Sequence, residues 1–367
     1  MNLDFSEEQK QLRDTVRAYL SDHAPMERAR TVLESGTGID RELWTVAGEM
    51  GWLGVTIPEA YGGCGFGSLE LAVVAEELGR AISPVPVSSS IYLACEAILR
   101  GGSEEQQERY LPKLASGELI GTFALAEAGG VTAPATMQAT LRDGRLYGTK
   151  VNVPDGLIAD FATFVARDES GEVCVGIVDF DQPAVSRHAL PVFDRTKPAA
   201  TVEFSGASVD LMKPAAGGED FVADLLDHGV LFTAFEQLGG AQACLEMARD
   251  YSLERFAFGR PIGSYQAMKH RMADMFVKTE IARSNCYYGA WAVSSAKEEM
   301  PIAACVARIS ASDAFEFCAQ ENLHVHGGVG CTWEYDCHLY LRRAKALEQS
   351  FGRSGGWKER LASRLLY

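Results

Sequence analysis

The hydrophobic pattern of the chain changes period twice, and this change limits the fold more than any single motif does. Residues 1–118 carry apolar side chains three to four positions apart, as helices do, whereas residues 119–213 contain short runs of strand-forming residues between glycine turns. From residue 219 to residue 367 the helical spacing returns. The pattern predicts an α+β protein with an N-terminal all-α domain, a middle antiparallel β domain and a C-terminal α-helical bundle domain.

Local signals agree with this division. Two capping boxes, Ser6-x-x-Gln9 and Ser103-x-x-Gln106, mark helix starts, and Ser68 is expected to cap a third helix. The predicted strands are rich in β-branched and aromatic residues and lie at residues 119–125, 161–165, 173–178 and 200–204. Turn pairs such as Asp143-Gly144 and Ser170-Gly171 separate them, and the stretch from residue 214 to 218 is typical of a linker.

Charge and cysteine content exclude several classes of function. The 34 basic and 50 acidic residues give a net charge of −16, which argues against binding to nucleic acid or to an anionic membrane surface. The first residues lack the pattern of a signal peptide, and no apolar run reaches membrane-spanning length. Nine cysteines without a Cys-x-x-Cys pair indicate reduced thiols in a cytoplasmic protein. The spacing of Cys331, Cys337 and His338 fits no zinc pattern, so no metal site is predicted.

The stretch Arg-Phe-Ala-Phe-Gly-Arg-Pro-Ile-Gly-Ser-Tyr-Gln, residues 255–266, separates two long helical patterns. Pro261 and the glycines at 259 and 263 predict a rigid corner, with Pro261 ending the first helix. Arg255 and Arg260 alternate with phenylalanines, which suits a planar anionic ligand because guanidinium groups pair with phosphate and aromatic rings pack on heterocycles. The same spacing also fits a plain turn between helices with solvated arginines.

At this corner the chain resembles the acyl-CoA dehydrogenase family. The family pattern is an Arg, two residues, Phe-Gly and an Ile-Gly-x-x-Gln run, and these places are filled by Arg255, Phe258, Ile262 and Gln266. Further segments of nearly the whole chain match, at residues 58–63, 110–117, 326–330, 332–336 and 338–345. The resemblance implies the three-domain fold of that family, with a four-helix bundle at the end. It also implies an FAD-dependent enzyme that introduces an α,β double bond into an acyl-CoA thioester and passes the electrons to an electron-transfer flavoprotein.

The resemblance places most of the cofactor site in the last domain. It implies that Arg255 and Phe258 hold the pyrophosphate and adjacent groups of an FAD that lies mostly in the neighbouring subunit, and that Gln266 lies near this cofactor. It also implies that His324, Gly327 and Gly328 contact the adenosine half, with His324 in the place of the usual glutamine. Glycines allow a close approach of the backbone to a ligand, although Gly327-Gly328 also fits a plain helix-terminating turn.

The segment expected at the flavin ring departs from the family pattern. Leu125 and Ala126 begin a run, Leu-Ala-Glu-Ala-Gly-Gly, where the family has Leu-Thr-Glu-Pro followed by Gly-Ser-Asp. Asn152 stands where the family has a tryptophan that stacks on the flavin. The resemblance leaves the backbone donors of Leu125 and Ala126 as the cofactor contacts at this end.

The catalytic base is the largest departure. The two places where family members carry the carboxylate fall on Phe351 and near Gly229, and neither residue accepts a proton. Glu236 is the better of two nearby carboxylates, and Glu348 is the other. In some bacterial relatives that act on steroid side-chain CoA thioesters, an α2β2 heterotetramer joins one chain with a base to one without.

Three hypotheses remain open from the sequence. The first is that the chain is the base-lacking subunit of a heteromeric acyl-CoA dehydrogenase for bulky acyl-CoA substrates. The second is a self-sufficient homo-oligomeric enzyme in which Glu236 is the base. The third is a non-catalytic scaffold that completes or regulates a partner enzyme.

Overall fold

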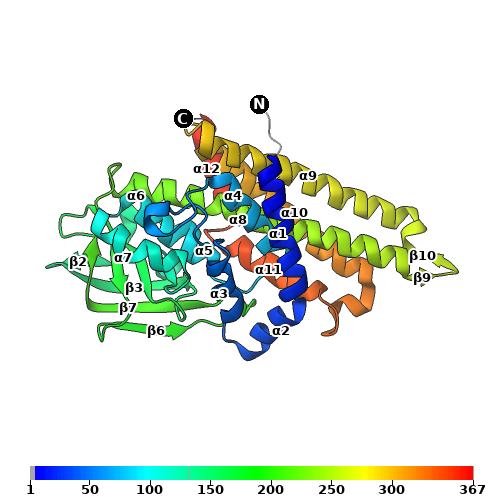
Figure 1. The fold of residues 1–367 in the computed structure, drawn as a ribbon, viewed down its shortest axis with the longest axis horizontal. Coiled ribbons are helices and arrows are strands. Elements are labelled where there is room, and N and C mark those ends of the chain that lie inside the picture. Colours follow the sequence, from blue (N-terminus) through cyan, green and yellow to red (C-terminus); the bar gives the residue numbers. More distant parts are fainter. Residues whose placement is uncertain (1–4, 131, 367) are drawn as a thin grey trace. The chain divides into compact units, whose positions relative to one another are not determined.

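The computed structural model describes residues 5–130 and 132–366, and it confirms the predicted α+β class (Figure 1). Helices precede and follow a central sheet in chain order. In space the chain divides into two compact units, each assembled from separate stretches. The first comprises residues 1–30, 68–83 and 230–367, and the second residues 31–67 and 84–229. The boundaries of the three domains expected from the sequence stay a prediction about chain order.

The first unit is a helical bundle. Its helices are α1 (Glu7–His23), α4 (Ser68–Arg80), most of α8 (Gly218–Glu254), α9 (Gln266–Ser295), α10 (Met300–His326), α11 (Cys337–Gln349) and α12 (Ser354–Leu366). Helices α8, α9 and α10 pack closely: a Cβ on Gly240 of α8 would lie 2.4 Å from the Phe315 ring on α10, and a Cβ on Gly289 of α9 would lie 2.5 Å from Leu231 on α8. Phe232, Phe235 and Phe315 are fully buried between them. Among the described residues, no helix is long and apolar enough to cross a membrane.

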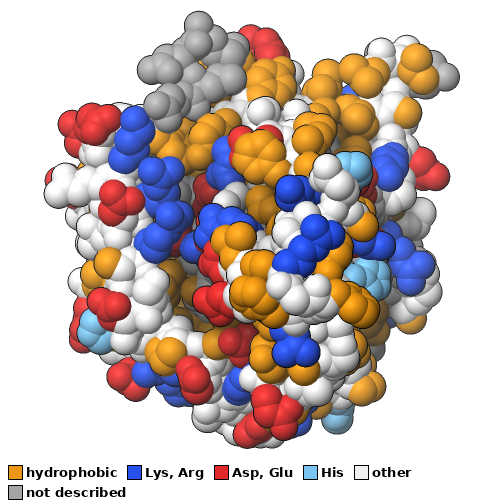
Figure 2. Space-filling model, turned by 90° about the vertical axis from the view of Figure 1, so that its right-hand side faces the viewer, with side chains coloured by type: hydrophobic (Ala, Val, Ile, Leu, Met, Phe, Trp, Pro, Cys, Tyr) orange, Lys and Arg blue, Asp and Glu red, His pale blue; other side chains and the backbone are white. Residues whose placement is uncertain are grey.

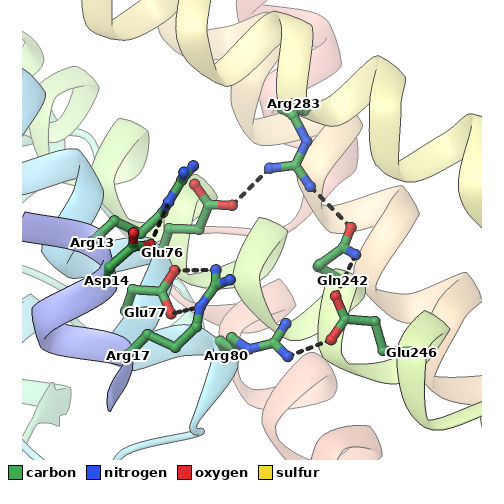
Figure 3. A network of polar contacts seen from close by, with 9 residues as sticks. All are labelled: Arg13, Asp14, Arg17, Glu76, Glu77, Arg80, Gln242, Glu246 and Arg283. Carbon is green, nitrogen blue, oxygen red and sulfur yellow. Dashed lines mark hydrogen bonds and ion pairs between the residues drawn. The ribbon is translucent and has the colours of Figure 1, made fainter. Parts of the chain in front are cut away.

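A network of charged side chains ties α1, α4, α8 and α9 together inside this bundle (Figure 3). Arg17 of α1 donates two hydrogen bonds, of 2.8 and 2.6 Å, to the carboxylate of buried Glu77 in α4. Arg283 of α9 donates to Glu76 of α4 at 2.7 Å and to Gln242 of α8 at 2.9 Å. Because breaking a buried ion pair is costly, the network holds α8 and α9 in one arrangement. This matters because the corner lies between these two helices.

The second unit contains the sheet and shorter helices. The helices are part of α2 (Met26–Ser35), α3 (Arg41–Glu49), α5 (Val87–Ser89), the π-helical turn η2 (Ser90–Cys95), α6 (Glu96–Gly101) and α7 (Glu104–Ala115). The strands are β1 (Gly121–Ala124), β2 (Thr140–Arg142), β3 (Arg145–Pro154), β4 (Phe161–Arg167), β5 (Val173–Asp179), β6 (Val185–Ala189), β7 (Ala199–Ser208) and β8 (Asp210–Leu211). Both predicted capping boxes are present, at Ser6 in the first unit and at Ser103 here.

The sheet order is β6-β7-β3-β2-β4-β5-β8, and β1 pairs with β4 beside this path. The sheet is mainly antiparallel, as in the pairing of β3 with β7 and of β4 with β5. Two pairings are parallel, which the sequence pattern did not indicate: β1 with β4, from Gly121 opposite Phe161, and β2 with β4 at Thr140. Strand β3 carries a register shift between Lys150 and Val153, where Asn152 has a φ of 51°.

Candidate functional site

The corner is a small β-hairpin. Helix α8 ends at Glu254, and β9 (Phe256–Ala257) pairs antiparallel with β10 (Arg260–Pro261) before the 3-10 turn η5 (Ile262–Ser264) leads into α9. The prediction that Pro261 ends the first helix is therefore wrong. Residues 255–262 leave the helix because their backbones pair with each other, and the Ile262 N–H donates to the Arg255 carbonyl at 2.8 Å. The rigid corner itself is present.

The tip of this hairpin presents its side chains outward. Phe258 has a φ of 51° and is 98% exposed, and Phe256 is 62% exposed. Arg255 is exposed at the end of α8, Ile262 is half-buried, and Gln266 is exposed as the first residue of α9. Figure 2 shows hydrophobic, basic and acidic side chains interspersed on the face toward which the hairpin points. At the hairpin itself, exposed phenylalanines lie beside exposed arginines, which suits a ligand or partner with both an apolar and an anionic part.

A second part of the predicted site lies at the end of α10. Gly327 ends this helix with a φ of 64° and begins η6 (Gly327–Cys331). A Cβ added at Gly327 or Gly328 would meet no atom within 4 Å, so the space above this turn is open. His324 lies one turn earlier with its side chain 64% exposed, and its Nδ1 is 3.3 Å from Glu321. The backbone of this turn is therefore open to a ligand, as it must be if Gly327 and Gly328 contact one.

The structure brings the corner and the glycine turn together. The Tyr251 ring of α8 stacks on the His326 ring of α10 with centroids 4.1 Å apart, and Tyr335 meets both rings edge-on. Tyr251 lies four residues before Arg255, about 6 Å along the helix. Tyr251 and His326 were not predicted as site residues. Their contact links two segments that the sequence pattern left separate.

The buried His326 ring predicts a pH dependence of stability. Burial lowers the pKa of His326, although a hydrogen bond of its Nδ1 with the Asn322 carbonyl, 2.8 Å away, opposes this. Since the unfolded chain then binds the proton more readily, the stabilising effect is complete above the unfolded pKa of about 6.5 and is lost as the pH falls below it. We expect unfolding free energies at pH 7.5 and pH 5.5 to differ less in His326→Phe than in the wild-type chain. An equal difference in both proteins would contradict this role.

The segment after β1 is held by a buried ion pair. Lys150 of β3 is fully buried, and its Nζ donates to Glu127 at 2.8 Å and to the Leu125 carbonyl at 3.0 Å. Glu127 also accepts from two backbone N–H groups, at residues 138 and 139. The Ala126 carbonyl accepts from the Val151 N–H. A ligand at Leu125 and Ala126 would therefore be bound through their N–H groups, because both carbonyls serve the chain itself.

Replacing Lys150 with methionine tests this ion pair. The change keeps the length of the side chain but leaves the Glu127 carboxylate buried beside an apolar group, which typically costs about 3–5 kcal/mol. We expect urea unfolding to show a loss of this size. The double variant Lys150→Met with Glu127→Gln removes the stranded charge and is expected to recover part of the loss. Equal stability of Lys150→Met and wild type would show that the pair does not hold the segment.

Neither family position for the base offers a proton acceptor. Gly229 is buried within α8. Phe351 lies in the turn between α11 and α12 with a φ of 58° and packs on a buried cluster formed by Val230, Ala304, Cys305 and Trp357. The Trp357 indole donates to the Phe351 carbonyl at 3.0 Å. Residue 351 is thus an apolar anchor of this turn.

Glu236 lies within the bundle rather than at the corner. Its side chain is 3% exposed, and its backbone packs so closely on α4 that a Cβ on Gly79 would lie 2.0 Å from the Glu236 carbonyl. Glu236 precedes Arg255 by 19 positions on α8, about 28 Å along the axis. Glu236 and a phosphate bound to Arg255 of the same chain would therefore be far apart. Its role as a base stays a prediction.

The family models match most of the chain. Residues 6–118 match the acyl-CoA dehydrogenase N-terminal domain, and residues 217–366 match the C-terminal domain of the same family. The chain belongs to the acyl-CoA dehydrogenase family. The resemblance is confirmed, and with it the enzyme class, an oxidoreductase that acts on acyl-CoA; members of this family are flavoproteins.

The chain is similar over nearly its whole length to individual acyl-CoA dehydrogenases, one of which is a steroid ACAD. The chain is 34% identical to the acyl-CoA dehydrogenase IpdE2 of Mycolicibacterium smegmatis, over 95% of this chain and 96% of that protein. Its structure is similar to that of a variant of the Tcur3481-Tcur3483 steroid ACAD, with a TM-score of 0.89, 31% identity and coverage of 98% of both chains. It is also similar to one chain of the ChsE4-ChsE5 complex of Mycobacterium tuberculosis, with a TM-score of 0.90 and 32% identity, over 100% of this chain and 99% of that chain.

Proposed function

We propose that this chain is one subunit of a heteromeric, FAD-dependent acyl-CoA dehydrogenase that acts on a bulky acyl-CoA, such as a steroid-derived thioester. The observation that carries the proposal is a contrast within one chain. The exposed corner and the open glycine turn are present, whereas Phe351 and Gly229 occupy the places of the base. A chain of this kind can contribute to a cofactor site but needs a partner that supplies the proton acceptor.

The residues fit the phosphate and adenosine parts of FAD. The exposed Arg255 guanidinium is suited to bidentate pairing with the pyrophosphate, and the bare backbone at Gly327 and Gly328 leaves room for a close approach. Phe258 adds an exposed apolar surface beside the phosphate. When bound, FAD supplies the hydride acceptor that α,β-dehydrogenation requires. An electron-transfer flavoprotein as the final acceptor and a cytoplasmic location are part of the same proposal.

Exposed apolar side chains support the proposal that a partner subunit binds this chain. Large exposed apolar side chains lie at the end of α8, on the hairpin and along α9: Leu253, Phe256, Phe258, Phe276, Val277 and Ile281 are each more than half exposed. Exposed apolar side chains at a cofactor corner and on the helix that follows it are typical of a protein–protein interface. Because this chain lacks the base, we propose a second acyl-CoA dehydrogenase-like chain in an α2β2 assembly as the occupant.

Expression of the chain alone and together with the product of a neighbouring gene of the same family tests the proposal. We expect flavin absorbance and acyl-CoA-dependent bleaching only in the mixed assembly, with equal amounts of the two chains. FAD that is bound and bleached by this chain alone would instead support the self-sufficient homo-oligomer. An assembly that forms without FAD would support the non-catalytic scaffold.

Glu236→Gln decides between the first two alternatives. In the mixed assembly we expect reduction of the flavin by acyl-CoA to change less than about twofold, because the base belongs to the partner. A general base contributes about 10²- to 10⁴-fold, so a self-sufficient enzyme that uses Glu236 would lose at least that factor. Single-turnover bleaching of the flavin is the measurement, and Glu219→Gln is the control because this glutamate is exposed at the start of the same helix.

A further inference from the structure

Tyr265, the residue between η5 and α9, contacts both strands of the corner hairpin. Its hydroxyl donates to the Ala257 carbonyl of β9 at 2.9 Å. The guanidinium of Arg260, in β10, lies 3.9 Å from the centre of the Tyr265 ring. Tyr265 is itself fixed at the start of α9, because its carbonyl accepts from the N–H groups of Met268 and Lys269 at 3.1 Å. One side chain thus fastens both strands to a long helix.

The hairpin needs such a fastening. Its strands are two residues long, and short isolated hairpins are marginal in water. The two turn residues, Phe258 and Gly259, have φ values of 51° and 82°, the signs of a type I′ turn. Asparagine, aspartate and glycine favour that turn, and a phenylalanine in the left-handed region is strained. An exposed and strained phenylalanine does not serve the stability of its own chain, which points to a ligand or partner as its contact.

The two arginines of the corner differ in their surroundings. The Arg260 guanidinium is engaged by the Tyr265 ring. The Arg255 side chain is exposed and forms no hydrogen bond or ion pair with any other residue that the structure describes. Cation–π stacking orders a guanidinium, so Arg260 contributes to the hairpin while Arg255 remains available to an anion.

We propose that Tyr265 is a positioning residue that pre-forms the hairpin and that Arg260 belongs to this clamp, so that the phosphate contact proposed above is left to Arg255 alone. The proposal rests on the proposed function, since it takes FAD as the ligand. Pre-forming the hairpin reduces the ordering cost of binding, because Phe258 and Arg255 need not be arranged at the moment of contact.

Hydrogen exchange and FAD affinity, measured on the same variants, test the clamp. Tyr265→Phe removes only the hydroxyl, and Tyr265→Leu removes the ring as well. We expect the Ile262 and Tyr265 amides to exchange roughly tenfold faster in Tyr265→Leu, with a smaller effect in Tyr265→Phe. We expect FAD to bind the mixed assembly roughly tenfold more weakly in Tyr265→Leu, with the KM for acyl-CoA unchanged. Tyr288→Phe, at a distant part of α9, is the control for loss of a tyrosine hydroxyl.

Two further changes separate the parts of the proposal. Arg260→Ala is expected to accelerate amide hydrogen exchange in the hairpin, as Tyr265→Leu does. Arg255→Ala is expected to leave this exchange unchanged and to weaken FAD binding. Phe258→Asn creates the favoured Asn-Gly turn, so it is expected to slow hydrogen exchange in the hairpin while weakening the binding of FAD. This opposite direction distinguishes a contact role of Phe258 from a folding role.

The outcomes that overturn the inference are distinct from those that overturn the proposed function. Unchanged exchange in Tyr265→Leu, or faster exchange with wild-type FAD affinity, overturns the clamp and leaves the subunit proposal intact. Equal FAD loss in Arg260→Ala and Arg255→Ala without faster exchange overturns the division between the arginines. Absence of FAD from every wild-type assembly overturns the proposed function and this inference together.

Discussion

Arg255→Ala is expected to weaken FAD binding to the mixed assembly about 100-fold, which corresponds to about 3 kcal/mol. The reason is the charge-assisted pairing of a guanidinium with the pyrophosphate, which no other side chain at the end of α8 replaces in this proposal. Arg255→Lys keeps the charge but loses the two-pronged geometry, so it is expected to fall between alanine and wild type. Flavin fluorescence during titration of the apo assembly measures the affinity.

The matched control for this prediction is Arg249→Ala. Arg249 is an exposed arginine on the same helix, and it pairs at 2.7 Å with the adjacent Asp250. Its removal changes the net charge as Arg255→Ala does, but it leaves the corner intact. A similar loss of FAD affinity in both variants would show that general electrostatic attraction, rather than a contact at the corner, governs binding. Unchanged affinity in Arg255→Ala would remove this arginine from the site.

The fold class was predictable because its signals are local. Ser6 and Ser103 are followed by glutamine three residues later, and both form the reciprocal hydrogen bonds of a capping box. Strands β4 and β5 were found because they are nearly continuous runs of apolar residues. Strand β3 was missed because Gly148, Lys150 and Asn152 interrupt it. The burial of Lys150 depends on Glu127, which precedes it by 23 residues, and no local pattern reports that pairing.

The candidate site was predictable only where a motif is continuous in sequence. Arg255, Phe258 and the glycine pair were named from short motifs, and the structure shows their exposure and the open space around the glycines. The contact that joins these motifs, between Tyr251 and His326, spans 75 residues and depends on the packing of two helix ends. The sequence pattern predicts only a helix break at the corner, because the strands of the hairpin are too short for an alternating pattern.

Replacing Arg308 is expected to have a large effect on the stability of the chain rather than on FAD binding. Arg308 is fully buried on α10, and its guanidinium donates to the carbonyls of Leu347 and Ser350 at 2.7 Å and of Glu348 at 3.1 Å, at the end of α11. It also donates to Gln237 of α8 at 3.1 Å. Burial lowers the pKa of Arg308 to about 10, so the group stays charged at neutral pH. A positive charge at a helix C-terminus is favourable, and here it also satisfies carbonyls that the helix leaves open.

Arg308→Leu is therefore expected to destabilise the chain by about 3–5 kcal/mol, because it leaves several buried polar groups without donors. Urea unfolding measures the loss, and Arg353→Leu at an exposed position of the following turn is the control. Arg308→Lys retains the charge but has fewer donors, so its stability is expected to lie between that of Arg308→Leu and that of the wild-type chain. If Arg308→Leu is as stable as wild type, the end of α11 does not depend on this cap. If the loss is found, the turn that carries Phe351 is held by a buried cation, and the chain keeps a rigid support at a position where it carries no base.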